Sequence, residues 1–307
     1  MSTDLQLRRE LLSPPGDTLK ESIDEIGMSQ AELAERMGRP KEKINDIIKG
    51  REPITMNTAI KLERVLGIPV SFWMKREFTY REELARIDQL TELEKMVSWM
   101  RSFPITELKK MDWLPKINDS IRLSDELLGF FGIASPVEWE EIYIKNEISV
   151  AFRTSLANYN SPHAVSAWLR MGELENAKND LPDFDKKKFK QMLHEIKDLV
   201  MTQPPDFHHQ LKDRCHDCGV GVVYTQTLPK APINGATRWL YGNPVIQLSD
   251  RFKSNDQFWF SFYHEAGHVL LHGKKEVFLE NTKTNQDDEK EIAANEFALK
   301  YLCPQQL

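Results

Sequence analysis

Residues 263–272 read YHEAGHVLLH and contain the pattern H-E-x-x-H within a stretch of helical apolar spacing. Residues four apart lie on one face of a helix, so His264 and His268 can direct both imidazoles at one metal ion. Glu265, one residue after the first histidine, is then placed to act as a general base on a water at that ion. Asp256 is predicted to cap the start of the helix. The alternative is a buried helix whose histidines bond to nearby carbonyls.

A hydrolytic metal site needs a third protein ligand and one open coordination position. Residues 287–298 read DDEKEIAANEFA and have apolar residues at helical spacing, so a second helix is predicted to deliver one carboxylate. This spacing does not choose among Glu289, Glu291 and Glu296, although Glu291 lies next to the apolar face. The alternative is a solvated run of charges.

Three runs in the C-terminal part occur in the order found in one known family. The runs VIQLS at 245–249 and FWF at 258–260 precede the H-E-x-x-H motif, and EIAANEFA at 291–298 follows it. Together they resemble the ImmA/IrrE family of metallopeptidase-like domains. The segment YLCP at 301–304 fits the end of the family motif loosely. The resemblance implies a zincin-like α+β domain with a small sheet.

The resemblance also implies roles for individual residues. In this family the third ligand is the glutamate four residues before the asparagine of the last motif, which is Glu291 here. The implied zinc ligands are His264, His268 and Glu291, with manganese as the alternative metal. Glu265 is the implied catalytic base.

Residues 17–73 are predicted to form short helices with sharply defined ends. Ser29 is expected to cap a helix over 30–37, with Glu32 three residues later completing a capping box. Gly38 ends that helix, and Pro40 suits the first turn of the next. Two helices joined by a tight glycine-containing turn indicate a helix-turn-helix.

Residues 28–38 read MSQAELAERMG and closely resemble the Xre family of phage-repressor-like regulators. The resemblance implies that residues 40–49 form the recognition helix, with its N-terminal residues in the major groove of operator DNA. Base edges or phosphates are assigned to Lys41, Lys43 and Asn45, and phosphates to Arg39, Lys49 and Arg51. A module this weakly basic is expected to act as a homodimer on a palindromic operator. The alternative is a bundle used only for dimerisation.

Composition supports both motifs. The chain has 307 residues, a net charge of −6 and three cysteines. The length predicts two domains or two plus a connecting region, and the acidic balance excludes general coating of nucleic acid. The absence of an apolar run of about 18 residues or a signal-peptide pattern predicts a cytoplasmic protein. Cys215 and Cys218 lack a second pair, which favours a helix end over a second metal site.

The predicted fold class is α+β, mostly α. Its parts are an N-terminal arm at 1–16, a helix-turn-helix domain at 17–79, a helical connecting region at 80–205 and the metallopeptidase-like domain at 206–307. Helices are expected over 80–100, 123–131, 139–154, 164–174 and 185–201, and strands over 220–225, 238–241 and 245–248. A strand edge near Trp239 is the predicted place for an extended peptide.

Two functions are consistent with these patterns. The first is a DNA-binding regulator whose zinc-dependent peptidase domain cleaves a regulatory repressor protein, with Tyr263 or His272 steadying the oxyanion. The second is a HigA-like antitoxin or repressor whose C-terminal domain senses, dimerises or binds a toxin without turnover.

Overall fold

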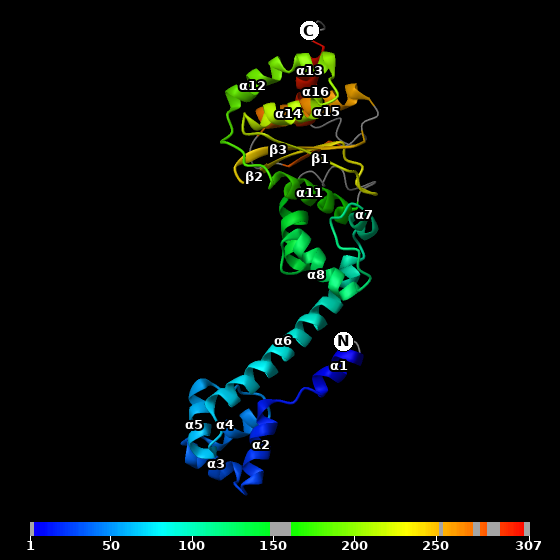
Figure 1. Cartoon of the computed structure of the whole chain (residues 1–307). Coiled ribbons are helices and arrows are strands. Elements are labelled where there is room, and N and C mark those ends of the chain that lie inside the picture. The colour runs from blue at the N-terminus through cyan, green and yellow to red at the C-terminus, as the bar shows by residue number, and fades with distance from the viewer. Residues whose placement is uncertain (1–2, 148–160, 252–253, 273–276, 281–288, 304–307) are drawn as a thin grey trace. The chain divides into compact units, whose positions relative to one another are not determined.

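A computed structural model describes residues 3–147, 161–251, 254–272, 277–280 and 289–303, and Figure 1 traces its elements. The chain divides into two compact units, 1–97 and 98–307. The predicted fold class is confirmed, because helices dominate and the strands form one small sheet. Among the described helices, none has the length and apolar character needed to cross a bilayer.

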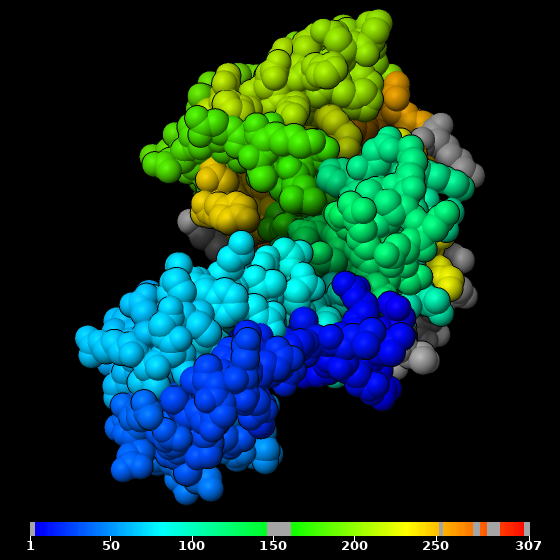
Figure 2. All heavy atoms as spheres, turned by 60° about the horizontal axis from the view of Figure 1, so that its bottom comes forward, coloured from blue at the N-terminus to red at the C-terminus, as the bar shows by residue number. Residues whose placement is uncertain are grey.

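The first unit is a bundle of short helices. They are α1 (Thr3–Glu10), α2 (Pro15–Glu25), α3 (Gln30–Met37), α4 (Lys41–Ile48), α5 (Met56–Leu66) and the start of α6 (Val70–Met100). Ser29 caps α3 by accepting a hydrogen bond from the Glu32 N–H, and Gly38 ends it in the left-handed conformation, as the sequence predicts. Leu19, Leu33, Ile44, Leu62 and Trp73 belong to the shared core. Figure 2 shows α2 to α5, in blue to light blue, as a closely packed body, whereas α1 lies apart from them beside α6 (Figure 1).

Close packing of α2 on α4 depends on one glycine. A side chain at Gly16 would place its Cβ 2.2 Å from the carbonyl oxygen of Ile48, which no side chain tolerates. The same part of the chain differs from the predicted arm at 1–16, because residues 3–10 form a helix in which Leu5 is buried. Burial of Leu5 stabilises this helix, which the composition of residues 1–16 does not predict.

Helix α6 continues through the boundary predicted at residues 79–80. Glu77 on this helix is buried, accepts a hydrogen bond from the Ile54 N–H at 3.0 Å, and pairs with Arg81 at 2.7 Å. Arg81 also donates to the carbonyl oxygen of Gly50. These bonds make residues on both sides of 79–80 part of the first unit, so the boundary lies further along the chain.

The second unit starts with a group of helices around aromatic side chains. These helices are α7 (Ile105–Lys110), α8 (Ser120–Phe131), α9 (Pro136–Trp139) and the π-helix η1 (Glu140–Glu147). Phe103 contacts Trp99, Phe131 and Trp139 with ring centroids 4.9 to 5.4 Å apart. The helix predicted over 139–154 is therefore split between α9 and η1 where it is described, and its last residues lie outside the described part.

The remaining elements surround a four-stranded sheet. The helices are α11 (Pro162–Asn176), α12 (Lys186–Glu195), α13 (Lys197–Thr202), α14 (Phe207–His216), α15 (Asn255–Leu271) and α16 (Glu289–Leu302). The strands β1 (Gly221–Thr225), β2 (Gly235–Leu240), β3 (Asn243–Ser249) and β4 (Phe278–Glu280) have the order β1-β3-β2-β4. Strand β3 is parallel to β1 and antiparallel to β2, and β4 is antiparallel to β2. Helix α11 covers one face of the sheet, whereas α15 covers the other (Figure 1).

Polar contacts between buried groups dock α11 on the sheet. Gln247 on β3 donates to the carbonyl oxygen of Trp168 at 2.7 Å, and Arg238 on β2 donates to that of Leu169 at 2.6 Å. A Cβ at Gly172 would lie 2.1 Å from the Gln247 amide oxygen, so only glycine allows this approach. The run 166–173, to which the sequence assigns no chemistry, is therefore a docking surface for the sheet.

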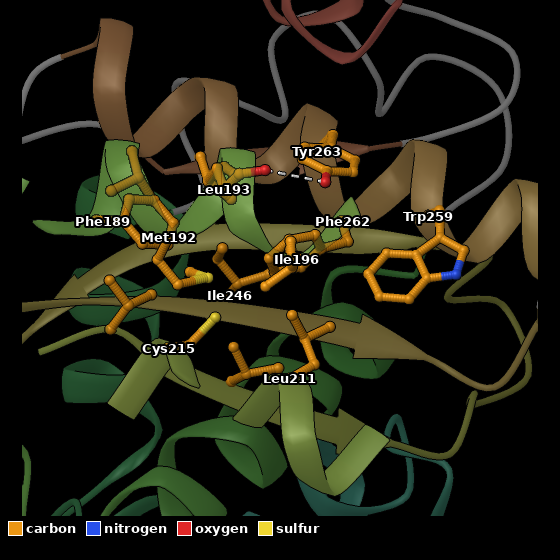
Figure 3. Packing of buried hydrophobic residues seen from close by; sticks show 14 of the residues in the cluster. Phe189, Met192, Leu193, Ile196, Leu211, Cys215, Ile246, Trp259, Phe262 and Tyr263 are labelled. Atoms are coloured by element: carbon orange, nitrogen blue, oxygen red, sulfur yellow. Dashed lines mark hydrogen bonds between the residues drawn. The ribbon is translucent and has the colours of Figure 1, made fainter. Parts of the chain in front are cut away.

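The main core lies between the sheet and the helices on the α15 face. Figure 3 shows Phe189 and Met192 of α12, and Ile196 directly after it, packed against Ile246 of β3 and Phe262 of α15. Cys215 is fully enclosed in the same core, and burial raises the pKa of its thiol well above the usual value. An enclosed, protonated thiol is a packing residue, which agrees with the sequence reading of this cysteine pair as a helix end.

Candidate metal centre and DNA-binding surface

Small residues let α16 approach the H-E-x-x-H helix closely. A Cβ at Gly267 would lie 3.3 Å from Cα of Ala294 and 3.2 Å from a ring carbon of Phe297. Ala294 is itself fully buried at this contact. The close approach brings Glu291, one turn before Ala294, beside the histidine face of α15.

The three predicted ligand residues converge. Nε2 of His264 lies 3.0 Å from Nε2 of His268, and the Glu291 carboxylate lies 3.2 Å from the first and 3.5 Å from the second. The ligand atoms are all within 4.8 Å of one another, and the residues form the one such metal-capable group found in the described part of the chain. Two imidazole nitrogens and one carboxylate oxygen form the donor set of many hydrolytic zinc sites, so these residues fit a metal ion.

Neighbouring side chains fix the orientation of both imidazoles. Nδ1 of His264 is 2.9 Å from the amide oxygen of Asn295, which makes Nδ1 the protonated nitrogen and leaves Nε2 as a potential ligand. Nδ1 of His268 is 3.0 Å from Nδ1 of His272. The ring of Phe278 on β4 stacks on His268 at 3.9 Å between centroids.

The proposed base, Glu265, is fully buried between α15 and the sheet. Thr237 on β2 donates a 2.6 Å hydrogen bond to its Oε2, whereas its Oε1 is buried and has no hydrogen-bond partner in the described part of the chain. Gly235 makes room for this oxygen, since a Cβ there would lie 2.7 Å from Oε1. A buried carboxylate oxygen without a partner is costly in a purely structural role, which points to a chemical one.

Burial and charge shift the pKa values of the group in opposite directions. Burial acts to lower the pKa of His264, but its hydrogen bond to Glu291 and the nearby carboxylates outweigh burial and hold it at about 9. Burial and the charge of His264 keep the pKa of His268 at about 4. Burial acts to raise the pKa of Glu291, but hydrogen bonds from both histidines bring it down to about 2. Burial raises the pKa of Glu265 well above its usual value.

Several sequence predictions near this site need correction. The Tyr263 hydroxyl cannot steady an oxyanion here, because it donates to the carbonyl oxygen of Leu193 within the core (Figure 3). Nδ1 of His272 lies 3.0 Å from Nδ1 of His268, so His272 is on the side of that ring opposite the ligand nitrogen Nε2. Helix α15 has Ser254 at its N-cap position, and Asp256 lies inside the first turn.

The predicted peptide edge near Trp239 stays a prediction. Strand β2 lies between β3 and β4 in the strand order, but the described part of β4 pairs with it only at residues 235–237, and Trp239 packs its ring against Phe184 at 5.4 Å between centroids. The edge strand on this side is β4, which carries Phe278 next to His268. A strand of three residues in the described chain has too weak a pattern to be predicted from sequence.

The predicted DNA-binding residues cluster on and around α4. Lys41, Asn45 and Lys49 follow one another at intervals of four and share a helix face, whereas Ile44 and Ile47 on the opposite face are buried. The remaining predicted residues are engaged with neighbours: Lys43 pairs with Glu52 at 2.7 Å, Arg51 with Asp46 at 3.7 Å, and Arg39 donates to Asn57 at 3.4 Å.

Sequence reasoning missed the residues that support the ligands. Thr237, Gly235 and Phe278 come from two strands, and no local pattern connects them to the H-E-x-x-H helix. Asn295 carried a usable signal, because it lies four residues after Glu291 and therefore on the same helix face. Asn57, which contacts Arg39, was also missed at the start of α5.

Comparisons with known proteins find one family match in the N-terminal part of the chain and another in the C-terminal part. Residues 19–73 match the helix-turn-helix profile, and residues 218–307 match that of the IrrE N-terminal-like domain. The chain is 30% identical over 87 residues to the uncharacterized HTH-type transcriptional regulator YddM of Escherichia coli (strain K12), covering 28% of this chain and 84% of that protein. It is 29% identical over 76 residues to virulence-associated protein I of Dichelobacter nodosus, covering 24% of this chain and 70% of that protein.

Solved structures add similarity to antitoxins. A HigA-family addiction-module antidote protein from Coxiella burnetii is 28% identical, with 26% of this chain and 89% of that chain covered and a TM-score of 0.25. The Pseudomonas aeruginosa antitoxin HigA with the higBA promoter is 30% identical, with 24% and 79% covered and a TM-score of 0.23.

The profiles and the relatives define a helix-turn-helix protein with a metallopeptidase-like C-terminal domain. The chain belongs to the HTH-type transcriptional regulators, and its C-terminal domain is of the IrrE N-terminal-like kind.

Proposed function

We propose that this regulator binds its own promoter as a homodimer through α4 and carries a zinc-dependent peptidase in its second unit. The single observation that carries the peptidase part is the convergence of His264, His268 and Glu291 beside the buried carboxyl of Glu265. The DNA part is supported by the helix-turn-helix match over residues 19–73 and by the exposed basic face of α4.

The proposed contact with DNA uses the exposed face of α4. Lys41 is on the first turn of α4, the part of a recognition helix that enters the major groove, and Asn45 is one turn further on. An asparagine can bond adenine through two hydrogen bonds, whereas lysine favours guanine or phosphate. Two copies on a palindromic operator would double these contacts and raise affinity for a weakly basic module.

The DNA part is tested by the affinity of the full chain for a duplex from its own promoter region. Lys41→Ala and Asn45→Ala should each weaken binding about tenfold or more, since a base contact contributes about 1–3 kcal/mol. Lys20→Ala on α2, an exposed lysine outside the recognition helix, is the matched control. Unchanged affinity in both α4 variants would remove α4 as the recognition helix.

In the peptidase part, His264, His268 and Glu291 would hold a zinc ion through Nε2, Nε2 and the carboxylate. When bound, such an ion polarises a peptide carbonyl and acidifies a water. Glu265 would accept a proton at Oε1, which has no hydrogen-bond partner among the described residues, from a water whose oxygen adds to the peptide carbonyl carbon, while Thr237 holds Oε2 in place. Glu265 would then pass that proton to the amine nitrogen as the peptide C–N bond breaks. Asn295 keeps the His264 imidazole in the tautomer that presents Nε2.

Glu265→Gln tests this assignment. The variant should lose cleavage of a peptide mixture, followed by mass spectrometry, and should keep its metal. Glu296→Gln, an exposed acid on α16, is the control. Cleavage by the Glu265→Gln protein at the parent rate would remove the base assignment.

The second candidate function is a non-catalytic antitoxin or repressor whose C-terminal domain senses a metal or binds a partner. The near-complete burial of Glu265, His264 and His268, at 0%, 2% and 1% exposure, favours it, because an enclosed site gives a substrate little access. This candidate predicts metal binding without peptide cleavage in the experiment above. A toxin or repressor protein as partner stays a prediction.

A further inference from the structure

A cleft of about 800 Å³ opens beside the metal centre and plays no part in the function proposed above. It lies along the first turns of α15, where Trp259, Phe260 and Ser261 line it, and reaches Glu280 at the end of β4. Glu280 is close enough to His264 for the two charges to shift each other's pKa. The cleft therefore adjoins the metal-binding side chains.

Most of the cleft wall is apolar, and only a few of the described residues that line it are charged. Apolar surface comes from Met201, Trp259, Phe260, Leu299 and Leu302. The charged residues in its lining are Arg251, Asp256 and Glu280, which together carry one negative charge when ionised. Arg251 and Asp256 are both exposed and carry opposite charges, so Glu280, whose carboxyl lies near His264, is the acid on which we focus.

Two polar atoms of the lining residues are buried and have no hydrogen-bond partner among the residues that the structure describes. They are Oε2 of Glu280, an acceptor, and Nε1 of Trp259, a donor. Unpaired buried groups of this kind cost free energy unless a ligand pairs with them. Burial raises the pKa of Glu280, so a cation placed beside it would restore the charged form.

We propose that this cleft binds a peptide segment through a lysine or arginine side chain, whose cationic end pairs with Glu280. The aliphatic stem of such a side chain matches the apolar walls, because long basic side chains bury their methylene groups and leave the charge at the tip. A peptide carbonyl oxygen can accept a hydrogen bond from the Nε1–H group of Trp259. The inference rests on the proposed function, which names a peptide as the ligand. It adds that the peptide is recognised through a lysine or arginine side chain.

Binding of two peptides that differ only in charge tests the inference. The probes are acetyl-Ala-Leu-Lys-Leu-Ala-amide and the same peptide with norleucine in place of lysine, titrated calorimetrically into the full-length Glu265→Gln protein loaded with zinc. The lysine peptide should bind about tenfold more tightly or better, as expected for a desolvated ion pair. Equal affinities, or no binding of the lysine peptide at millimolar concentration, would overturn the inference.

Glu280→Gln in the same protein keeps the shape of the side chain and removes its charge, so the preference for lysine should disappear. Asp256→Asn is the matched control, because Asp256 lies at the exposed rim of the same cleft and its loss should leave the preference unchanged. A preference lost in Asp256→Asn and kept in Glu280→Gln would place recognition at the rim and overturn the assignment.

The result can be separated from a failure of the proposed peptidase. Selective binding of the lysine peptide without cleavage by the parent chain would support the cleft and remove the catalytic function. Cleavage of peptides by the parent chain with no preference for lysine or arginine would support catalysis and remove the cleft assignment.

Discussion

Thr237 on β2 holds Oε2 of Glu265 on α15 through a 2.6 Å hydrogen bond, and the same hydroxyl lies 3.1 Å from the Glu265 carbonyl oxygen. The pair joins the central sheet to the helix that carries His264 and His268, the proposed metal ligands. Because Thr237 is 1% exposed, water does not compete for its hydroxyl. The orientation of the proposed base is therefore set by a strand residue.

Thr237→Val should lower peptide cleavage about 10- to 100-fold with zinc content unchanged, which is the range for removing a supporting hydrogen bond. Valine keeps the shape of threonine and removes the hydroxyl. Rates and bound metal would be measured on the same preparations. Thr237→Ser retains the hydroxyl and should behave like the parent. A valine variant with the parent rate would show that Thr237 does not position Glu265.

Zinc binding should depend on Glu291 and not on the acid two residues before it. The parent is expected to hold about one zinc per chain after dialysis, and Glu291→Ala should hold almost none, because two histidines alone make a weak site. Elemental analysis of the dialysed proteins measures both. Glu289→Ala is the control, since Glu289 is exposed at the start of α16. Zinc retained by Glu291→Ala would disprove the ligand assignment.

Gly235→Ala should destabilise the second unit, because the new Cβ would lie 2.7 Å from Oε1 of Glu265. Crowding of this kind costs about 1–3 kcal/mol in a packed interior. Urea unfolding would measure the change in the free energy of unfolding. Gly129→Ala on α8 is the comparison, since nothing lies within 4 Å of a Cβ there. Alanine at that helical position should be neutral or stabilising. Equal effects of the two substitutions would contradict the contact.

The stability of the metal-free protein should be greatest at mildly acidic pH. The pKa of His264 is raised to about 9, so its contribution is complete below about 6.5 and is lost as the pH rises toward 9. The pKa of Glu291 is lowered to about 2, so its contribution is present above about 4.5 and is lost as the pH falls toward 2. The pKa of His268, lowered to about 4, adds to the loss below about 6.5.

Unfolding curves across pH with chelator present would measure this profile. Zinc should stabilise the protein more as the pH rises toward 9, because the metal must displace the proton of His264. His264→Gln in chelator should lose part of the decline at alkaline pH, since the raised pKa of Glu265 also lowers stability as the pH rises. A flat profile in the parent between pH 6 and pH 9 would contradict the charge coupling of His264 with Glu291.

Glu52→Gln should strengthen binding to operator DNA several-fold. In the structure Glu52 pairs with Lys43 at 2.7 Å, so the substitution frees one cation and removes one negative charge near the recognition helix. The dependence of log affinity on log salt should become steeper by about one, as expected for one more phosphate contact. Titrations of duplex at several salt concentrations measure both quantities. Glu21→Gln on α2 is the control, and an unchanged slope in Glu52→Gln would contradict a free Lys43.

Much of the fold is predictable because its signals are local. The cap at Ser29, the stop at Gly38 and the spacing of Ile44 and Ile47 each lie within about one helical turn, so sequence alone indicates the short helices of the first unit. The pattern His264, Glu265 and His268 is equally local. Helix α6 was less predictable, because its length follows from the contacts of Glu77 and Arg81 with distant residues.

The rest of the site depends on residues that are far apart in the chain. The apolar spacing of the last helix does not decide whether Glu289, Glu291 or Glu296 is the third ligand, and the family resemblance selects Glu291. In the structure, the contact of Gly267 with Ala294 brings Glu291 to the histidines. Tyr263 illustrates the opposite case: its position beside His264 suggested a catalytic role, but the helix turns its ring toward the core.

The two kinds of domain, the proposed metal ligands His264 and His268 and the predicted recognition helix can be inferred from the sequence alone, because each depends on spacing along one helix. The groups that support them are set by the packing of the folded chain. Thr237, Gly235, Phe278 and Glu280 reach the site through the pairing of β2 with β4, and such pairing is set by the packing of whole elements. Side chains that no local period connects become neighbours only when the sheet forms against α15.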